Sequence, residues 1–72
     1  MPPIRDLTDL ARELRLRRRD LELTQDQLAA VSGLNRRVIG ELERGRISAR
    51  FETVLSIANA LGLDVELQPR GR

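Results

Sequence analysis

The chain has 72 residues, with 13 basic and 11 acidic side chains, a net charge of +2, and neither cysteine nor histidine. A chain of this length reaches the lower size limit for a self-sufficient hydrophobic core, so we expect one domain over residues 1–72 and suspect dimerisation. Disulfides, thiolate or imidazole metal sites and the usual nucleophile and base pairs are excluded, which argues against an enzyme and against a cofactor.

The first predicted element is an amphipathic helix from Leu7 to about Arg19. Leu7, Leu10 and Leu14 recur at helical spacing among charged residues. Three consecutive arginines end the helix, where positive charge offsets the negative end of the helix dipole. All the basic residues are arginines, and most fall in two groups, namely Arg15, Arg17, Arg18 and Arg19, then Arg36, Arg37, Arg44, Arg46 and Arg50. We expect positive potential on one surface.

Two short helices around a tight turn come next. Thr24 and Gln27 have the spacing of a capping box, so the second helix begins at Gln25, and it ends near Val31 because Gly33 permits the positive φ of a sharp turn. Asn35 is a good N-cap for a third helix, which Gly45 ends. Two helices that cross steeply need a small residue where they approach, a glycine at the bend and branched apolar residues in the later helix. Ala29, Gly33, Ile39 and Leu42 meet these needs, so we predict a helix-turn-helix over residues 25–44.

A fourth helix is predicted after residue 48. Ser48 can cap it, and its apolar stripe runs from Phe51 to Leu61 before Gly62 ends it. The apolar residues of the predicted helices could line a ligand pocket or form the hydrophobic core. We expect a core, because a chain of this size has too few other apolar residues to build one. The predicted core contains Leu28, Ile39, Leu42, Val54 and Leu61.

Residues 63–68 alternate apolar and polar side chains, which predicts a strand. The chain offers no second strand, so the edge must be paired by the same segment of an identical subunit. Leu63, Val65 and Leu67 would then form the dimer interface, in an antiparallel ribbon whose two-fold axis passes at Val65 or at Glu66.

Several short strings in the sequence resemble the lambda-repressor-like, or XRE, helix-turn-helix family over roughly residues 7–62. They are Leu23-Thr24-Gln25, Leu28-Ala29, Gly33-Leu34, Ile39 and Leu42-Glu43-Arg44-Gly45. The sequence is also similar to the HipB-type antitoxin branch, through Arg36-Arg37-Val38-Ile39, Ser48-Ala49-Arg50, Ala60-Leu61-Gly62-Leu63 and the terminal strand. The resemblance implies an all-α, four- to five-helix lambda-repressor-like DNA-binding domain with a short C-terminal β-strand that pairs across a dimer.

The resemblance also implies which residues meet DNA. The third helix would lie in the major groove, and the expected base-contacting residues are Asn35, Arg36, Arg37 and Glu41. Phosphate contact or a solvated face is the alternative for the two arginines, and Glu41 could instead hold Arg37 through an i,i+4 pair. The expected phosphate-contacting residues are Gln25, Arg18, Arg19, Arg44 and Arg46. Two residues depart from the pattern of the family. Asp26 places a negative charge near the expected phosphate, and Gly40 stands where a small polar residue is often found.

The implied function is a sequence-specific repressor that binds a palindromic operator in double-stranded DNA as a homodimer and neutralises a HipA-type kinase toxin. A stand-alone or phage-type repressor without a toxin is an alternative, and a protein-bridging coactivator is another. No apolar run approaches the roughly 20 residues that span a bilayer, and the Pro2-Pro3 start lacks a secretory signal, so we expect a cytoplasmic, nucleoid-associated protein with no membrane partner.

Overall fold

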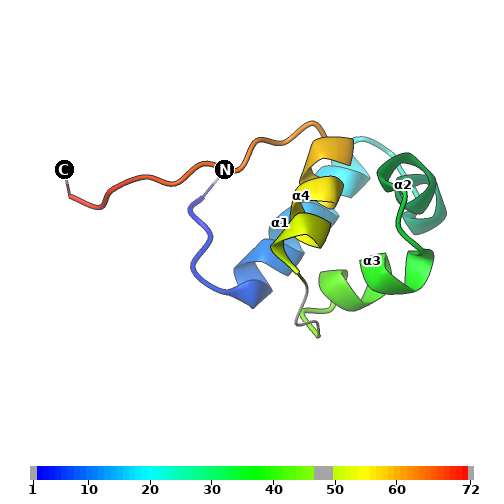
Figure 1. The fold of residues 1–72 in the computed structure, drawn as a ribbon, viewed down its shortest axis with the longest axis horizontal. Coiled ribbons are helices and arrows are strands. Elements are labelled where there is room, and N and C mark those ends of the chain that lie inside the picture. The colour runs from blue at the N-terminus through cyan, green and yellow to red at the C-terminus, as the bar shows by residue number, and fades with distance from the viewer. Residues whose placement is uncertain (1, 47–49, 72) are drawn as a thin grey trace.

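The structure is a computed structural model that describes residues 2–46 and 50–71. Over these residues it contains four helices and no strand, namely α1 (Leu7–Asp20), α2 (Gln25–Ser32), α3 (Arg36–Glu43) and α4 (Phe51–Ala60). Helix α2 packs against α3 and α4, and α1 packs against α3. Figure 1 shows α2 and α3 joined by a tight turn at one end of the molecule. The predicted all-α, lambda-repressor-like class is confirmed.

The predicted helix starts in the first half of the chain are confirmed by their hydrogen bonds. The Thr24 hydroxyl accepts from the Gln27 N–H at 3.0 Å, and the Gln27 side chain accepts from the Thr24 N–H at 2.8 Å, which completes the capping box. Asn35 Oδ1 accepts from the Val38 N–H at 3.0 Å at the start of α3. Gly33 has φ +77°, so the turn between α2 and α3 uses the left-handed conformation that glycine tolerates.

The start of α4 differs from the sequence-based expectation. Helix α4 begins at Phe51, and its N-cap residue, Arg50, makes no capping hydrogen bond through its side chain. The predicted cap, Ser48, lies outside the described residues. Phe51 is exposed, so the buried face of α4 is formed by Ile57 and Ala58, nearer its C-terminal end.

The hydrophobic core joins all four helices through six residues, Leu14, Leu28, Ile39, Leu42, Ile57 and Leu61. Four of the five predicted core residues are in this set, and each fully buried aliphatic side chain contributes about 1.5–3 kcal/mol of transfer free energy. Val54, the fifth, is only half-buried because it lies in the N-terminal half of α4, whereas the buried residues Ile57 and Ala58 lie in the C-terminal half. The core fixes the angle at which α2 and α3 cross.

The C-terminal segment leaves the helices as an extended chain, which Figure 1 shows in orange and red. The Leu63 N–H donates to the Ala58 carbonyl at 2.8 Å, and Leu63 packs against the core. Beyond it, Val65 is 47% and Leu67 is 96% exposed. The pairing of this segment with a second subunit stays a prediction.

Candidate nucleic-acid interface

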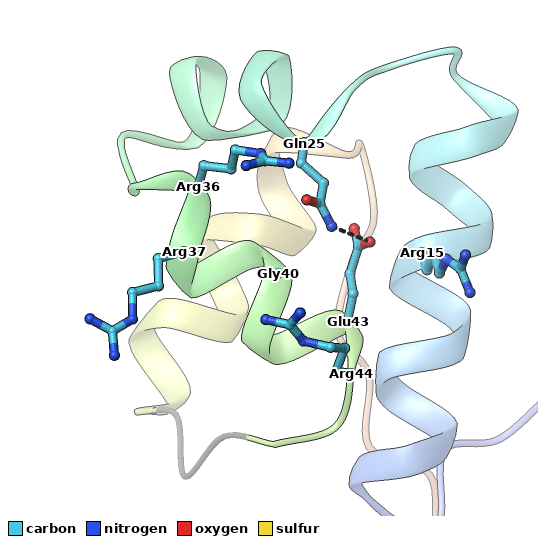
Figure 2. A pocket seen from close by; sticks show the side chains of 7 residues that line it. All are labelled: Arg15, Gln25, Arg36, Arg37, Gly40, Glu43 and Arg44. Atoms are coloured by element: carbon cyan, nitrogen blue, oxygen red, sulfur yellow. Dashed lines mark hydrogen bonds between the residues drawn. The ribbon is translucent and has the colours of Figure 1, made fainter.

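The first turn of α3 presents two arginines to solvent. The side chains of Arg36 and Arg37 are 66% and 86% exposed, and they project from neighbouring positions of the helix (Figure 2). Asn35 is exposed as well, but its Oδ1 already caps α3. A two-bond contact between Asn35 and adenine would need this same oxygen, whereas both guanidinium groups have donors to spare.

Both arginines have acidic neighbours on the protein surface. Nε of Arg36 lies 3.4 Å from Oδ1 of Asp26 in α2, and Nε of Arg37 donates to Oε1 of Glu41 at 2.9 Å. The i,i+4 pair of Arg37 and Glu41 is thus present. It was one of the two roles that the sequence suggested for Glu41. Exposed ion pairs contribute at most about 1 kcal/mol, so neither acid prevents its arginine from meeting an anion.

A shallow groove runs beside these arginines, between α1, the start of α2 and the exposed face of α3. Besides Arg36 and Arg37, Figure 2 shows it lined by Arg15, Gln25, Gly40, Glu43 and Arg44. Within the described part of the chain, the guanidinium groups of Arg15 and Arg44 have no ion pair or hydrogen bond. Four arginines and one acidic residue, Glu43, line the groove, so it carries an excess of positive charge next to α3.

A second shallow depression adjoins the first, because Arg15, Glu43 and Arg44 line both. Arg19 lines this second depression, four residues after Arg15 on α1. Arg15 was absent from the expected site residues, although its i,i+4 spacing from Arg19 places both on one face of the helix. Arg46, in contrast, is exposed but lines neither depression.

Arg18 lies on the same face of α1 as the buried Ala11 and Leu14, and it forms a buried ion pair whose partner the sequence did not predict. Its guanidinium donates from Nε and Nη2 to the two carboxylate oxygens of Glu43, at 2.6 and 2.9 Å, and from Nη1 to the Leu23 carbonyl at 2.7 Å. The residue is only 9% exposed. Arg18 was expected to contact phosphate, but its three nitrogens are bound to Glu43 and Leu23 inside the fold, so it does not face DNA.

Arg17 is also bound within the fold. Its Nε donates at 2.9 Å to the carbonyl of Leu61, the C-cap residue of α4. This bond satisfies one of the carbonyl groups that a helix end leaves without a partner. Of the arginines that end α1, Arg17 and Arg18 therefore stabilise the fold, while Arg19 remains exposed.

Glu43 is ionised in the folded chain. Burial would raise the pKa of its carboxyl group, but hydrogen bonds from Arg18 and Gln25, and the positive charges of Arg18 and Arg15, together hold that pKa below its usual value of 4.5. The hydrogen bond with Glu43 correspondingly raises the pKa of Arg18. Gln25 Nε2 lies 3.2 Å from Glu43 Oε1, so the Gln25 side chain is bent toward α3.

Residues 2–46 and 50–71 contain no cluster of three or more acidic side chains able to hold a metal ion. None of the described helices is long and apolar enough to cross a membrane.

Known proteins resemble this chain in both sequence and fold. The helix-turn-helix family model HTH_3 matches residues 12–68. An uncharacterized HTH-type transcriptional regulator of Sinorhizobium fredii, y4mF, is 32% identical over 68 residues, which are 94% of this chain and 90% of the relative. The match therefore extends through the helix-turn-helix and nearly the whole of both proteins.

Two solved structures share the fold over most of the chain. A chain of a HipA-HipB-O2-O3 complex aligns with a TM-score of 0.89 and 26% identity, and the alignment covers 97% of this chain and 99% of that one. The restriction-modification controller protein C.AhdI from Aeromonas hydrophila aligns with a TM-score of 0.77 and 36% identity, over 82% of this chain and 86% of that one.

Proposed function

The chain belongs to the HTH_3 helix-turn-helix family of XRE-type transcriptional regulators, a non-enzymatic family, and on this premise we propose that it is a sequence-specific, dimeric repressor. The first turn of α3 enters the major groove, and the adjoining groove of the protein follows one DNA strand. The observation that carries this proposal is the pair of exposed guanidinium groups at the start of α3, next to a groove with an excess of positive charge.

Arg36 and Arg37 supply base readout in this proposal. A guanidinium can donate two hydrogen bonds to O6 and N7 of guanine, which discriminates against other bases by about 1–3 kcal/mol. Asn35 contributes through its amide nitrogen, since its oxygen caps α3. Glu41 orients Arg37 and is available to accept from cytosine N4.

Phosphate contacts supply affinity that does not depend on sequence. Gln25 and the free N–H groups at the start of α2 meet one phosphate, because helix N-termini favour anions. Arg44 and Arg15 line the groove on either side of Glu43, and Arg19 extends the positive surface along α1. Arg46 is exposed but lines neither depression, and in this proposal it contacts a more distant phosphate.

Residues 63–68 form the dimer contact in this proposal. Val65 and Leu67 are exposed apolar side chains on an extended segment, and in the described residues no strand pairs with it. Antiparallel pairing with the same segment of a second subunit covers Leu63, Val65 and Leu67 and satisfies the free backbone groups. The two-fold axis sets the two α3 helices about 34 Å apart, which requires a palindromic operator.

We further propose that the repressor is the antitoxin of a HipA-type kinase toxin and acts in the cytoplasm, on the nucleoid. The support is the alignment with a chain of a HipA-HipB-O2-O3 complex over nearly the full length of both. If so, the adjacent gene encodes a kinase that co-purifies with this chain. A neighbour that forms no complex removes the antitoxin role and leaves the repressor role.

A second candidate is a stand-alone regulator without a toxin. The higher identity to the controller protein C.AhdI, 36% against 26%, supports it, although that alignment covers less of the chain. The same co-purification experiment distinguishes the two. A protein-bridging coactivator is a weaker alternative, because none of the relatives named above is one.

Selection of bound duplexes from a random pool tests the repressor proposal. We expect an enriched palindrome with half-sites about one helical turn apart, also found upstream of the chain's own gene. Recovery of duplexes without any shared sequence would contradict sequence-specific binding.

A further inference from the structure

The buried carboxylate of Glu43 binds side chains from two other helices. Its Oε1 accepts from Nη2 of Arg18 in α1 and from Nε2 of Gln25 in α2, at 2.9 and 3.2 Å. The Glu43 side chain is only 5% exposed, although it lines the same groove as Gln25, the groove proposed to face DNA (Figure 2). We infer that Glu43 is a positioning residue for DNA binding that acts by fixing the orientation of the Gln25 amide, an inference that rests on the proposed function.

In the hydrogen bond between Gln25 and Glu43, the amide must donate and the carboxylate must accept. A primary amide can turn over and exchange its donor end with its acceptor end, but an ionised carboxylate only accepts hydrogen bonds. Glu43 therefore holds Nε2 of Gln25 toward itself and fixes where Oε1 and the second N–H lie. Among residues 2–46 and 50–71 the Gln25 amide makes no other hydrogen bond, so the second N–H is available to a phosphate.

Gly40 leaves the space in which the amide lies. A β-carbon at position 40 would be 3.9 Å from Oε1 and 4.0 Å from Nε2 of Gln25, which is ordinary van der Waals contact. The Gln25 amide thus lies over the exposed face of α3 and next to the Glu43 carboxylate. A side chain longer than alanine at this position would meet it.

The burial of Glu43 does not depend on the bond from Gln25. Arg18 already donates to both carboxylate oxygens, and its third donor is bound to the Leu23 carbonyl. The ion pair is therefore complete without Gln25. The hydrogen bond from Gln25 instead links the ion pair to a side chain of the groove. We therefore expect its loss to change DNA binding.

A double-mutant cycle tests the inference. Four chains are titrated with a mixed-sequence duplex at low salt: the unchanged chain, Glu43→Gln, Gln25→Ala and the double variant. Removal of one negative charge beside DNA would by itself raise affinity. We expect Glu43→Gln to lower affinity about fivefold instead, because an amide at position 43 can bond either end of Gln25 and no longer fixes its orientation.

The matched control is Glu13→Gln, the same substitution on α1 at a residue that lines neither depression. We expect it to leave affinity unchanged or slightly higher. In the Gln25→Ala background, Glu43→Gln is expected to change affinity by less than about twofold. An equal loss in both backgrounds overturns the inference while leaving DNA binding intact. If the unchanged chain binds no duplex, the proposed function fails as well.

A second measurement uses the unchanged chain, since Glu43→Gln also weakens a buried ion pair. Nuclear magnetic resonance compares the side-chain amide of Gln25 with that of Gln68, which is exposed. We expect the Nε2 hydrogens of Gln25 to exchange with water more slowly than those of Gln68. Equal exchange rates would mean that Glu43 does not hold the amide, and would overturn the inference.

Discussion

Arg18 and Glu43 form an ion pair with two hydrogen bonds, 2.6 and 2.9 Å long, although 25 residues separate them in the sequence. The pair joins the last turn of α1 to the last residue of α3. Both side chains are almost completely removed from water. The position of α3 relative to α1 is therefore fixed by a directional polar contact as well as by the apolar core.

Breaking this pair should destabilise the fold. Arg18→Met leaves the buried Glu43 charge without its cation and with only the Gln25 amide as a hydrogen-bond donor, so we expect the free energy of unfolding to fall by about 3–5 kcal/mol in urea titrations. The double variant Arg18→Met/Glu43→Leu removes both charges and should recover most of that loss. A single variant that loses less than about 1 kcal/mol would contradict a buried, structurally important pair.

Glycine substitutions should have opposite effects at two positions. Gly40 lies in α3, and the nearest atom to an added β-carbon is Arg44 Nη2 at 3.6 Å, so Gly40→Ala should stabilise the chain by about 0.5–1 kcal/mol through helix propensity. Gly33 has φ +77°, and Gly33→Ala should destabilise it by about 1 kcal/mol or more. Thermal unfolding of the two variants checks the signs, and a stabilising Gly33→Ala would contradict the turn geometry.

Stability should fall in acid through Glu43. Its pKa in the folded chain lies below the usual value of 4.5, so between the two values the unfolded state binds more protons than the folded state. The contribution of Glu43 is complete above pH 4.5 and is lost as the pH falls through its folded pKa. Urea titrations across this range should show a steeper decrease for the unchanged chain than for Glu43→Gln.

The comparison with Glu43→Gln is needed because Asp9 titrates in the same region. A hydrogen bond from the Arg5 N–H, and to a lesser degree one from the Arg12 side chain, lowers the pKa of the half-buried Asp9 carboxyl group. Both chains retain Asp9, so the difference between their pH profiles measures the contribution of Glu43 titration to stability. Identical profiles would show that the folded carboxyl of Glu43 titrates at its usual pKa.

Disrupting the C-terminal segment should separate the proposed dimer. Val65→Pro removes a backbone N–H and introduces a ring that a paired strand does not accommodate, so analytical ultracentrifugation should find a monomer with much weaker operator binding. The exposed Leu67→Gln is a milder variant that keeps the backbone donors and should shift the equilibrium less. If Val65→Pro remains dimeric with its operator affinity intact, contacts through the exposed Phe51 become the better candidate.

Local signals in the sequence predicted the first three helices well. A capping box or an asparagine cap acts within three residues, so Thr24 and Asn35 could be identified before any tertiary contact was known. The burial of Ile39 and Leu42 followed from their spacing on one helix. The apolar stripe of α4 was identified, but Val54 and Phe51 lie toward its N-terminal end and are less buried than Ile57 and Ala58, because the packing partners of a helix decide which part of a wide stripe is buried.

Long-range polar contacts could not be predicted in this way. Helical spacing puts Arg18, but not Arg19, on the face of α1 that buries Ala11 and Leu14, yet nothing in the sequence identifies Glu43 as its partner. Only the helix crossing brings Glu43 within reach of α1. For the same reason Arg15 was missed, since its place beside Gln25 and Arg44 depends on how α1 packs against α3.

Base readout by the first turn of α3 is best tested with Arg37→Ala. The affinity of this variant is measured for operator DNA and for random DNA at the same salt concentration. We predict a loss of about 1–3 kcal/mol on the operator and little change on random DNA, because a base contact is lost. Arg44→Ala, the phosphate-contact control, should weaken both and reduce the slope of log K against log salt by about 0.9. Equal losses on both DNAs for Arg37→Ala and for Arg36→Ala would contradict base readout by the first turn of α3.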